Sequence, residues 1–486
     1  MPPTEDLSRE ELVAMLALRD ATIAGLVASN AELRGLVADL ERRLGRNSGN
    51  SSMPPSSDDR PGVNRATRRA GKVSERKRGK QPGAPGSGLS WTAEPDTMVA
   101  HVPAGACDCG RPLADATDLG VGRSHQVHDV ALVNATVTQH DLHRAQCDCG
   151  QIHQALRPEG MSASATSYGP NLQALVVYLL TFQHLPVERA ALLIADLTGA
   201  QPSVGFVHGM LARAGDQLED VDALIRAQIA ASPVVGFDET TLRVGPAGVK
   251  QHVLAANTDT HTALWLGGRG LDSFHAFGVL DAFTGIAVHD RYSLYDHPSF
   301  GEFAGHQLCV AHLARDLADA AECWPTHHWP AQAAHALRGL IRCAHQARAR
   351  GEPTVTGPDA DAHHHLFQQA VLVGLSQIPP TPGGRNVKQL PARALLECLR
   401  DREHDVLRFT TDTRVPPTNN GSERTVRPEK TQQKISGRLT SEAHTRHRLR
   451  LRSYLATAAK HHIGMLDALR QALTGNPWLP PDPAPA

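Results

Sequence analysis

Three acidic residues lie where they could meet in the folded chain and hold metal ions. Asp238 follows an apolar strand-like segment, and Asp290 directly follows a second one at 286–288. Glu423 falls in the first turn of a helix expected late in the chain. Converging carboxylates suit hard divalent cations such as Mg²⁺ or Mn²⁺. A pair of such ions supports cleavage and transfer of phosphodiester bonds, so we predict a two-metal catalytic site.

Each of these acids also has an ordinary structural interpretation. Asp238 could simply end a strand, Asp290 could be a turn residue, and Glu423 could favour the dipole at a helix N-terminus. Asp296 competes for the place of the second acid. We prefer Asp290, because it directly follows the apolar strand, whereas Asp296 lies beyond it in an expected loop.

The elements around the acids predict how they could be brought together. A strand centred on Val234–Phe237, with Asp238 at its far end, precedes two more strands, a helix, a fourth strand, and a fifth strand that leads into a helix. This is the order of the ribonuclease-H-like α/β fold, in which the first and fourth strands lie side by side. We therefore expect a catalytic core over 231–323 and 411–470, with a helical insertion at 324–410.

Basic and amide side chains near the acids are candidate DNA contacts. His312 and Arg315 lie three residues apart on one helix, which turns both toward the same side. They could contact DNA or support the acids, or they could be plain surface residues. Arg424 and Arg427 could bind phosphates. The full candidate set near the acids is His312, Arg315, Asn419, Asn420, Arg424 and Arg427. The run of histidines at 363–365 is more typical of a surface.

Two matching CDCG segments suggest a structural zinc site. They supply Cys107 and Cys109, then Cys147 and Cys149, and four thiolates suit a tetrahedral Zn²⁺. The alternative is a set of inert cysteines. Residues 125–147 alternate as strands do, so a small zinc-ribbon-like β module is expected over 96–160.

The N-terminal 95 residues divide into a helix and a linker. Apolar residues recur in steps of four and three from Leu12 to Leu44, with Asn30 at an a position, which predicts a coiled-coil dimerisation helix over 1–46. An amphipathic helix packed on its own chain is the alternative. Residues 47–95 are rich in Ser, Pro and Gly, which is typical of a flexible linker. Its basic residues are candidate phosphate contacts, although they could form a solvated tail: Arg65, Arg68, Arg69, Lys72, Arg76, Lys77, Arg78 and Lys80.

Residues 165–230 read as helices arranged in a helix-turn-helix. The second helix of this motif would begin after Ser203, a candidate N-cap, and would read a DNA groove with Ser203 and His208 near its start. An ordinary helical hairpin fits the same pattern.

Composition narrows the class of protein. The chain has 486 residues, of which 41% are hydrophobic and 20% charged, so it is not a wholly disordered chain. It has no long apolar run and no secretory signal, and its eight cysteines are too few for a disulfide scaffold. These features favour a protein of a reducing cytoplasm. The net charge of −1 hides a strong local asymmetry.

These segments together resemble a transposase of the insertion-sequence-66 family, the DDE type. The resemblance covers nearly the whole chain, and its most specific segments are LGRNSGNSSMPPSSD and NNGSER. It implies that Asp238, Asp290 and Glu423 form the catalytic triad, with a helical insertion before the last acid. It also implies strand cleavage at the terminal repeats of an element and strand transfer to target DNA. The expected partners are double-stranded DNA, a second copy of the chain or a higher oligomer, and accessory proteins in some elements.

Two other functions fit parts of the pattern. A catalytically idle DNA-binding protein derived from a transposon would not need the three intact acids. A structure-specific endonuclease of the same fold would not need the long N-terminal DNA-binding apparatus.

The first prediction concerns dimerisation. A peptide of residues 1–46 is expected to form a parallel dimer at tens of micromolar. Asn30→Leu should tighten association but relax the choice of oligomer, because a buried Asn fixes register at a cost in stability. Analytical ultracentrifugation measures both effects, and a peptide that stays monomeric would contradict the coiled coil.

Overall fold

A mixed five-stranded sheet carries two of the three acids. The computed structural model describes residues 8–45, 91–128, 134–158, 164–382 and 389–482. Within them the strand order is β5-β4-β3-β6-β7. The strands are β3 (Val234–Leu242), β4 (Gln251–Asn257), β5 (Thr262–Gly267), β6 (Ile286–His289) and β7 (Gly305–Leu308). The first three are antiparallel, and β6 runs parallel to β3 and β7. The prediction that the first and fourth strands are neighbours is confirmed.

Strand β3 is longer than we expected. It continues past Asp238 to Leu242, because residues 236–242 pair with β4. Its parallel pairing with β6, however, covers only Val234 to Gly236. Asp238 therefore lies in the middle of a strand, just beyond the point where the parallel ladder ends.

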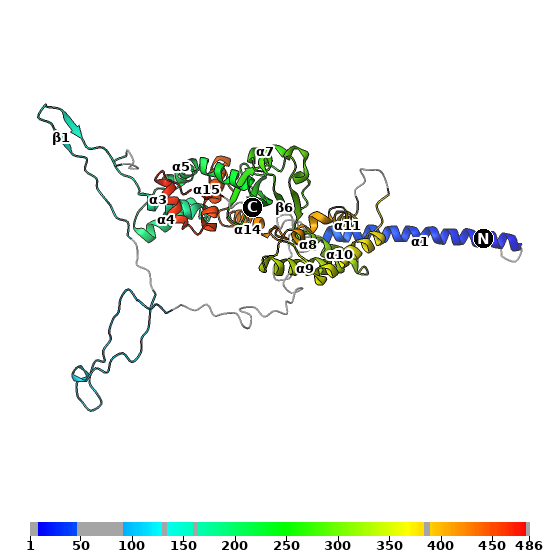
Figure 1. Cartoon of the computed structure of the whole chain (residues 1–486), viewed down its shortest axis with the longest axis horizontal. Coiled ribbons are helices and arrows are strands. Elements are labelled where there is room, and N and C mark those ends of the chain that lie inside the picture. The colour runs from blue at the N-terminus through cyan, green and yellow to red at the C-terminus, as the bar shows by residue number, and fades with distance from the viewer. Residues whose placement is uncertain (1–7, 46–90, 129–133, 159–163, 383–388, 483–486) are drawn as a thin grey trace. The chain divides into compact units, whose positions relative to one another are not determined.

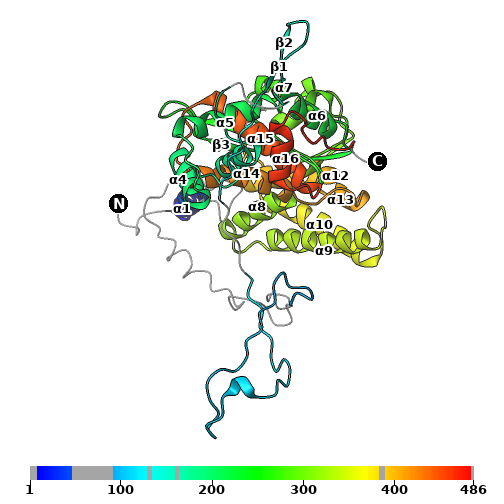
Figure 2. The same cartoon turned by 90° about the vertical axis from the view of Figure 1, so that its left-hand side faces the viewer.

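Helices pack around the sheet, and they occur in the segments where the sequence predicted helices. The described residues of the expected insertion are mostly helical, and α9 and α10 run side by side (Figure 2). The helices around the sheet are α7 (Leu271–Phe277), α8 (Val310–Cys323), α9 (Trp329–Ala349), α10 (Pro358–Gln377), α11 (Pro391–Asp401), α12 (Glu403–Val406), α13 (Arg408–Thr411), α14 (Asn420–Ile435), α15 (Glu442–Lys460) and α16 (Met465–Leu473). Short 3-10 turns are η4 (Leu280–Ala282), η5 (Ser293–Asp296) and η6 (Pro298–Phe300).

The helices before the sheet match the predicted helix-turn-helix segment in position. They are α3 (Pro170–Thr181), α4 (Val187–Thr198), α5 (Val204–Asp216) and α6 (Glu219–Ala230), seen beside α15 in Figure 1. Ser203 is the N-cap of α5, since its side chain accepts a hydrogen bond from the Phe206 amide. The N-cap prediction is therefore confirmed.

The chain divides into two units, and the two CDCG segments belong to different ones. The smaller unit comprises 60–137 and 197–199, and it contains Cys107 and the 3-10 turn η3 (Leu113–Asp115). The larger unit contains Cys147, which follows β1 (Arg144–Gln146) in a hairpin with β2 (Ile152–Gln154). The strands expected over 125–147 are wrong for the described residues apart from β1. Side chains there are mostly exposed, so their alternation has no core to face.

Residues 9–45 form one continuous helix, α1, as predicted. Leu16, Ile23, Leu26 and Val37 of the predicted heptad are exposed in the single chain. Their exposure is what the coiled-coil hypothesis expects before a partner helix is added. The basic linker residues 65–80 lie outside the described residues. Among the described residues, no helix combines the length and apolar character needed to cross a bilayer.

A buried ionic cluster joins α14, α15 and the end of α3. Glu429 is fully buried and pairs with Arg452 at 2.8 Å and with Arg448 at 3.4 Å. Arg448 also contacts His184 Nδ1 at 2.8 Å and donates to the carbonyl of Leu180 at 2.9 Å. Buried charges require such partners, so this cluster fixes the helices to one another.

The second prediction is a loss of stability in acid through His184. Burial and the positive charges of Arg448 and Arg452 lower the pKa of His184 to about 4 from 6.5. The unfolded chain therefore binds a proton between these values while the folded chain does not, so stability falls as pH falls from about 6.5 to about 4. His184→Asn keeps an acceptor and a side chain suited to the left-handed backbone at φ 60°. The substitution should reduce the loss of unfolding free energy between pH 6.5 and pH 4 by roughly 1–2 kcal/mol, a value that already allows for solvent screening.

Chemical denaturation at pH 7 and pH 4.5 measures this change. The matched control is His462→Asn, which makes the same exchange at another left-handed position whose side chain is exposed. Equal slopes with pH for the parent and His184→Asn would contradict the assignment.

Candidate active site

The register of β3 and β6 aligns the first two acids. Gly236 lies opposite Val288 in the parallel pair. Asp238 and Asp290 each lie two residues further along, so they continue the same row, and strand alternation points both to one face of the sheet. Each carboxylate accepts a local amide hydrogen bond, from Glu239 N at 2.9 Å and from Tyr292 N at 2.8 Å respectively.

The segment before Glu423 anchors α14 on this row. Asn419 is buried, and its side-chain amide donates to the carbonyl of Phe237. A Cβ on Gly236 would lie 2.5 Å from Ser422 Oγ, so only glycine lets the helix come this close to the strand. Gly421 packs with similar closeness against Asn257 at the end of β4. These contacts bring the first turn of α14, with Glu423, to the acids of the sheet.

The three acids lie near enough for their charges to interact. The pKa of Asp238 is raised well above its ordinary value, first by burial and then by the negative charges of Glu239, Asp290 and Glu423. Carboxylates that interact in this way repel one another unless a positive charge lies between them. Carboxylate oxygens are also the ligands that hard divalent cations prefer.

Basic side chains surround Glu423. His312 and Arg315 of α8 both face it, with distances to its Oε1 of 3.8 Å and 3.5 Å, and Arg427 lies 3.4 Å from its Oε2. Burial and the charge of Arg315 lower the pKa of His312, which favours a neutral ring. The expectation that His312 and Arg315 turn to the same side is confirmed.

The remaining candidates lie in different surroundings. Asn420 and Arg424 are exposed at the start of α14, and His208 is exposed on α5. Asn419 already bonds the backbone and is 3% exposed, so its amide is not available to DNA. Asp296 lies away from the row and forms a two-bond ion pair with Arg402.

A buried polar group behind the row was missed by the sequence analysis. Glu239 points to the face opposite Asp238, where it pairs with Arg269 at 2.5 Å and accepts a hydrogen bond from Tyr295 at 3.0 Å. Burial, then the charge of Asp290, raises the pKa of Glu239. The sequence signal for this group was the pair of adjacent acids in the DET segment. No sequence pattern pointed to Arg269 and Tyr295, because they are distant from Glu239 in the chain and meet it only in the fold.

The two CDCG segments form the same tight turn. In each, the first cysteine amide donates to a carbonyl four residues on at 2.8 Å, and a glycine with positive φ closes the turn. Amide and thiol hydrogen bonds from the second cysteine lower the pKa of Cys107 and of Cys147. Such thiols are disposed to ionise as metal ligands must.

Comparison with protein families identifies the chain. Residues 165–446, more than half of its length, match the transposase IS66 family. The chain belongs to the IS66 family of transposases. This transposase also matches, over residues 1–90, a family of unknown function (DUF6444). No curated protein matches it. The resemblance drawn from the sequence is confirmed at the level of the family.

The third prediction tests how α14 is seated in the transposase. Gly236→Ala places a methyl group against Ser422 and Asn419, so either the helix or the strand must shift. We expect a loss of roughly 1–3 kcal/mol in unfolding free energy. The control Gly209→Ala fills open space on α5 and should instead stabilise the protein by about 1 kcal/mol. Thermal or chemical denaturation distinguishes them, and equal effects would contradict the close contact.

Proposed function

We propose that this transposase cleaves and joins DNA ends at a ribonuclease-H-like site formed by Asp238, Asp290 and Glu423. The observation that carries this proposal is the alignment of the first two acids by the β3–β6 register, with α14 seated beside them. The strand order β5-β4-β3-β6-β7 supports the same fold. The raised pKa of Asp238 supports a site that is completed by cations.

Different residues of the site would bind the metal ions and orient the DNA. The three carboxylates would hold a pair of Mg²⁺ or Mn²⁺ ions, which when bound activate the attacking oxygen and stabilise the leaving oxygen. Arg315 and Arg427 flank Glu423 and lie where they could orient a DNA phosphate. Because DNA is itself anionic, these arginines also offset repulsion between substrate and site.

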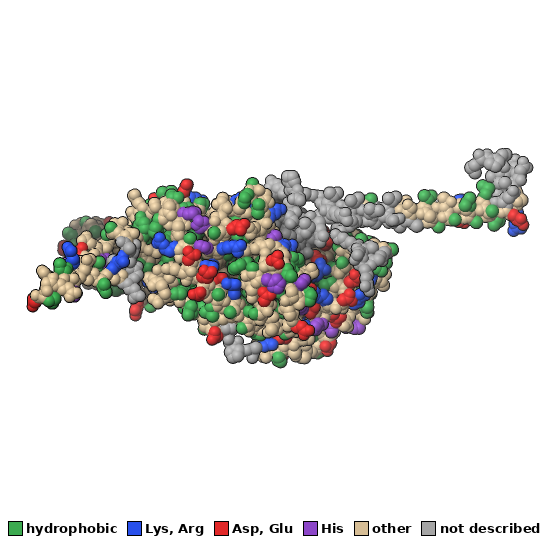
Figure 3. All heavy atoms as spheres, turned by 90° about the horizontal axis from the view of Figure 1, so that it is seen from above, with side chains coloured by type: hydrophobic (Ala, Val, Ile, Leu, Met, Phe, Trp, Pro, Cys, Tyr) green, Lys and Arg blue, Asp and Glu red, His purple; other side chains and the backbone are tan. Residues whose placement is uncertain are grey.

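We further propose a path for DNA along the exposed face of α14. Arg424, Arg427, Thr431 and Lys434 are exposed and recur at helical spacing on one side. Other basic residues nearby donate to backbone carbonyls of other segments: Lys430, Arg438, Arg446 and Arg450. Over the main body seen in Figure 3, acidic and basic side chains are interspersed, so phosphate binding depends on such local stripes.

The remaining parts would recognise and assemble the element ends. We propose that α5, with Ser203 and His208 near its start, reads a DNA groove and that the basic linker 65–80 adds contacts independent of sequence. The coiled coil α1 would pair two copies on DNA. We propose that each CDCG turn offers two thiolate ligands to a structural Zn²⁺, Cys107 with Cys109 and Cys147 with Cys149, and the lowered thiol pKa values support this.

The fourth prediction tests the triad. Asp238→Asn, Asp290→Asn and Glu423→Gln should each lower cleavage and joining of element ends about a thousandfold, since loss of a metal removes several kcal/mol of transition-state stabilisation. Binding to the ends should survive. The matched control Asp272→Asn changes an exposed acid of α7 and should keep parental activity. Parental cleavage by all three triad variants would contradict the DDE assignment.

The fifth prediction tests the DNA path. Arg424→Gln combined with Lys434→Gln should weaken binding to specific and random duplexes alike and reduce the salt slope by about 2. Arg338→Gln combined with Arg342→Gln is the control, because these exposed arginines lie on α9. Fluorescence anisotropy over a range of salt concentrations measures both slopes. If the two pairs have the same effect, DNA does not follow α14.

A further inference from the structure

A buried chain of polar side chains lies directly behind Asp290. Successive side chains of a strand point to opposite faces, so His289 turns away from the triad while Asp290 turns toward it. His289 is fully buried. Its Nδ1 contacts the backbone carbonyl of Asp290. A carbonyl can only accept a hydrogen bond, so Nδ1 of His289 must carry the proton.

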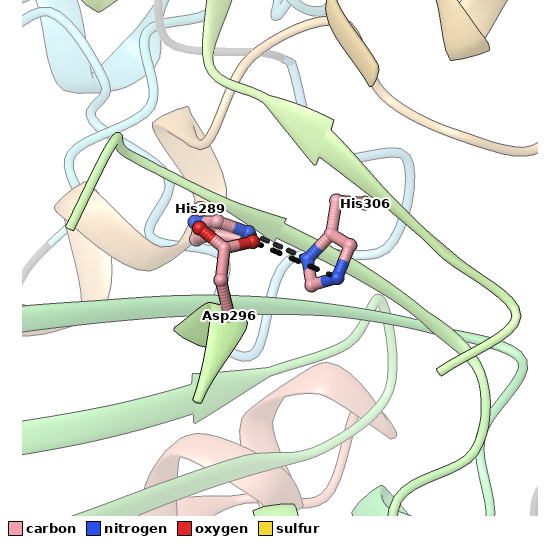
Figure 4. A group of neighbouring side chains, drawn as sticks. All are labelled: His289, Asp296 and His306. Atoms are coloured by element: carbon pink, nitrogen blue, oxygen red, sulfur yellow. Dashed lines mark hydrogen bonds and ion pairs between the residues drawn. The ribbon is translucent and has the colours of Figure 1, made fainter. Parts of the chain in front are cut away.

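The proton on Nδ1 fixes the roles of the next groups. A fully buried ring that carries its proton on Nδ1 is neutral, so its Nε2 is an acceptor. His306 on β7 places its Nδ1 3.0 Å from this Nε2 and therefore donates to it. The other ring nitrogen of His306 faces Asp296 Oδ1 at 3.8 Å, as Figure 4 shows.

The outer end of this chain is held by the helices of the insertion. Arg402 binds both oxygens of Asp296, at 2.8 Å and 2.9 Å, and binds Asp405 at 2.9 Å. Arg408 donates to the backbone carbonyl of His306 at 2.8 Å. Hydrogen bonds thus join Arg408, His306, His289 and the Asp290 carbonyl in turn. The link from His306 to Asp296 and Arg402 is a longer contact of 3.8 Å.

The same side chains could be taken for a zinc site. His289, Asp296 and His306 are the group of potential ligands that lie within 4.8 Å of one another among the described residues. However, His289 Nε2 already accepts from His306 Nδ1, and the guanidinium of Arg402 binds both oxygens of Asp296. A cation would have to displace that positive charge, so the contacts favour a chain of polar side chains over a metal site.

We propose that Arg402, Asp296, His306 and His289 form a positioning chain that fixes the backbone of Asp290 and thereby aims its carboxylate at the metal site. This inference rests on the proposed role of Asp290. Ladder pairing of β6 ends at His289, opposite Leu308, and the His289 carbonyl still accepts from the Cys309 amide at 2.8 Å. The Asp290 carbonyl lies one peptide beyond this bond and is contacted by the His289 ring. Groups that orient a metal ligand from outside contribute about 10- to 100-fold in metal affinity or activity.

The test measures metal binding by the full-length protein and its catalysis separately. His289→Leu should weaken Mn²⁺ binding roughly tenfold by titration calorimetry without DNA, and should raise the Mg²⁺ needed for half-maximal cleavage by a similar factor. Affinity for DNA ends should not change. His289→Asn, whose amide can donate to the Asp290 carbonyl, should recover most of the loss. His365→Leu, at an exposed position on α10, is the control.

A milder variant protects the test against misfolding. Asp296→Asn alters the partly exposed outer end of the chain and should weaken Mn²⁺ binding about threefold, less than the 10- to 100-fold range for a group that contacts the ligand itself. A lower melting temperature with unchanged Mn²⁺ affinity in His289→Leu and Asp296→Asn would reduce the chain to a structural role and overturn the inference. Equal losses in His289→Leu and His289→Asn would also overturn it.

Two further outcomes separate this inference from other accounts. Zinc that is lost in His306→Leu but kept in Cys107→Ser would make the group a metal site and overturn the inference. If Asp290→Asn leaves Mn²⁺ affinity unchanged, the proposed role of Asp290 fails. In that case an effect of His289→Leu on Mn²⁺ binding would have to act through another ligand.

Discussion

Repulsion between Asp238 and the acidic side chains around it is the constraint on which the arrangement of this part of the sheet depends. Burial and three neighbouring acids raise the pKa of Asp238, so the fold opposes a force that would separate them. Two features oppose it: the parallel ladder that aligns Asp238 with Asp290, and the close contact of Ser422 with Gly236. These contacts explain why small and amide side chains occur in the NNGSE segment, because Asn419, Gly421 and Ser422 each contact the sheet.

The basic residues of the C-terminal region serve two different purposes. Arg448 and Arg452 are buried around Glu429 and tie α14 to α15 and to the end of α3. The helix that carries Glu423 thus shares one polar core with α15 and with the end of α3. Arg424, Arg427 and Lys434 remain on the surface of α14, where phosphate could reach them. The number of charges along the sequence does not distinguish these two purposes, whereas the burial of each side chain in the structure does.

The sequence predicted local structure well, because helices, strands and caps depend on neighbouring residues. The adjacency of the first and fourth strands followed instead from the order of elements along the chain, which matches a known fold. The five strands of the sheet, the N-cap at Ser203 and the helix that begins near Glu423 all follow from periodicity and turn chemistry. The strands expected over 125–147 failed because alternation predicts a strand only where a core covers one face. Contacts such as Glu239 with Arg269, or His289 with His306, join distant segments and leave no periodic signal. The long β3 was missed because its end is set by pairing with β4.

The most direct test of this account is anomalous diffraction from crystals of the full-length transposase soaked in Mn²⁺. The account predicts two peaks about 4 Å apart between the carboxylates of Asp238, Asp290 and Glu423. Peaks that lie instead among His289, Asp296 and His306, with the three carboxylates turned away from one another, would contradict it.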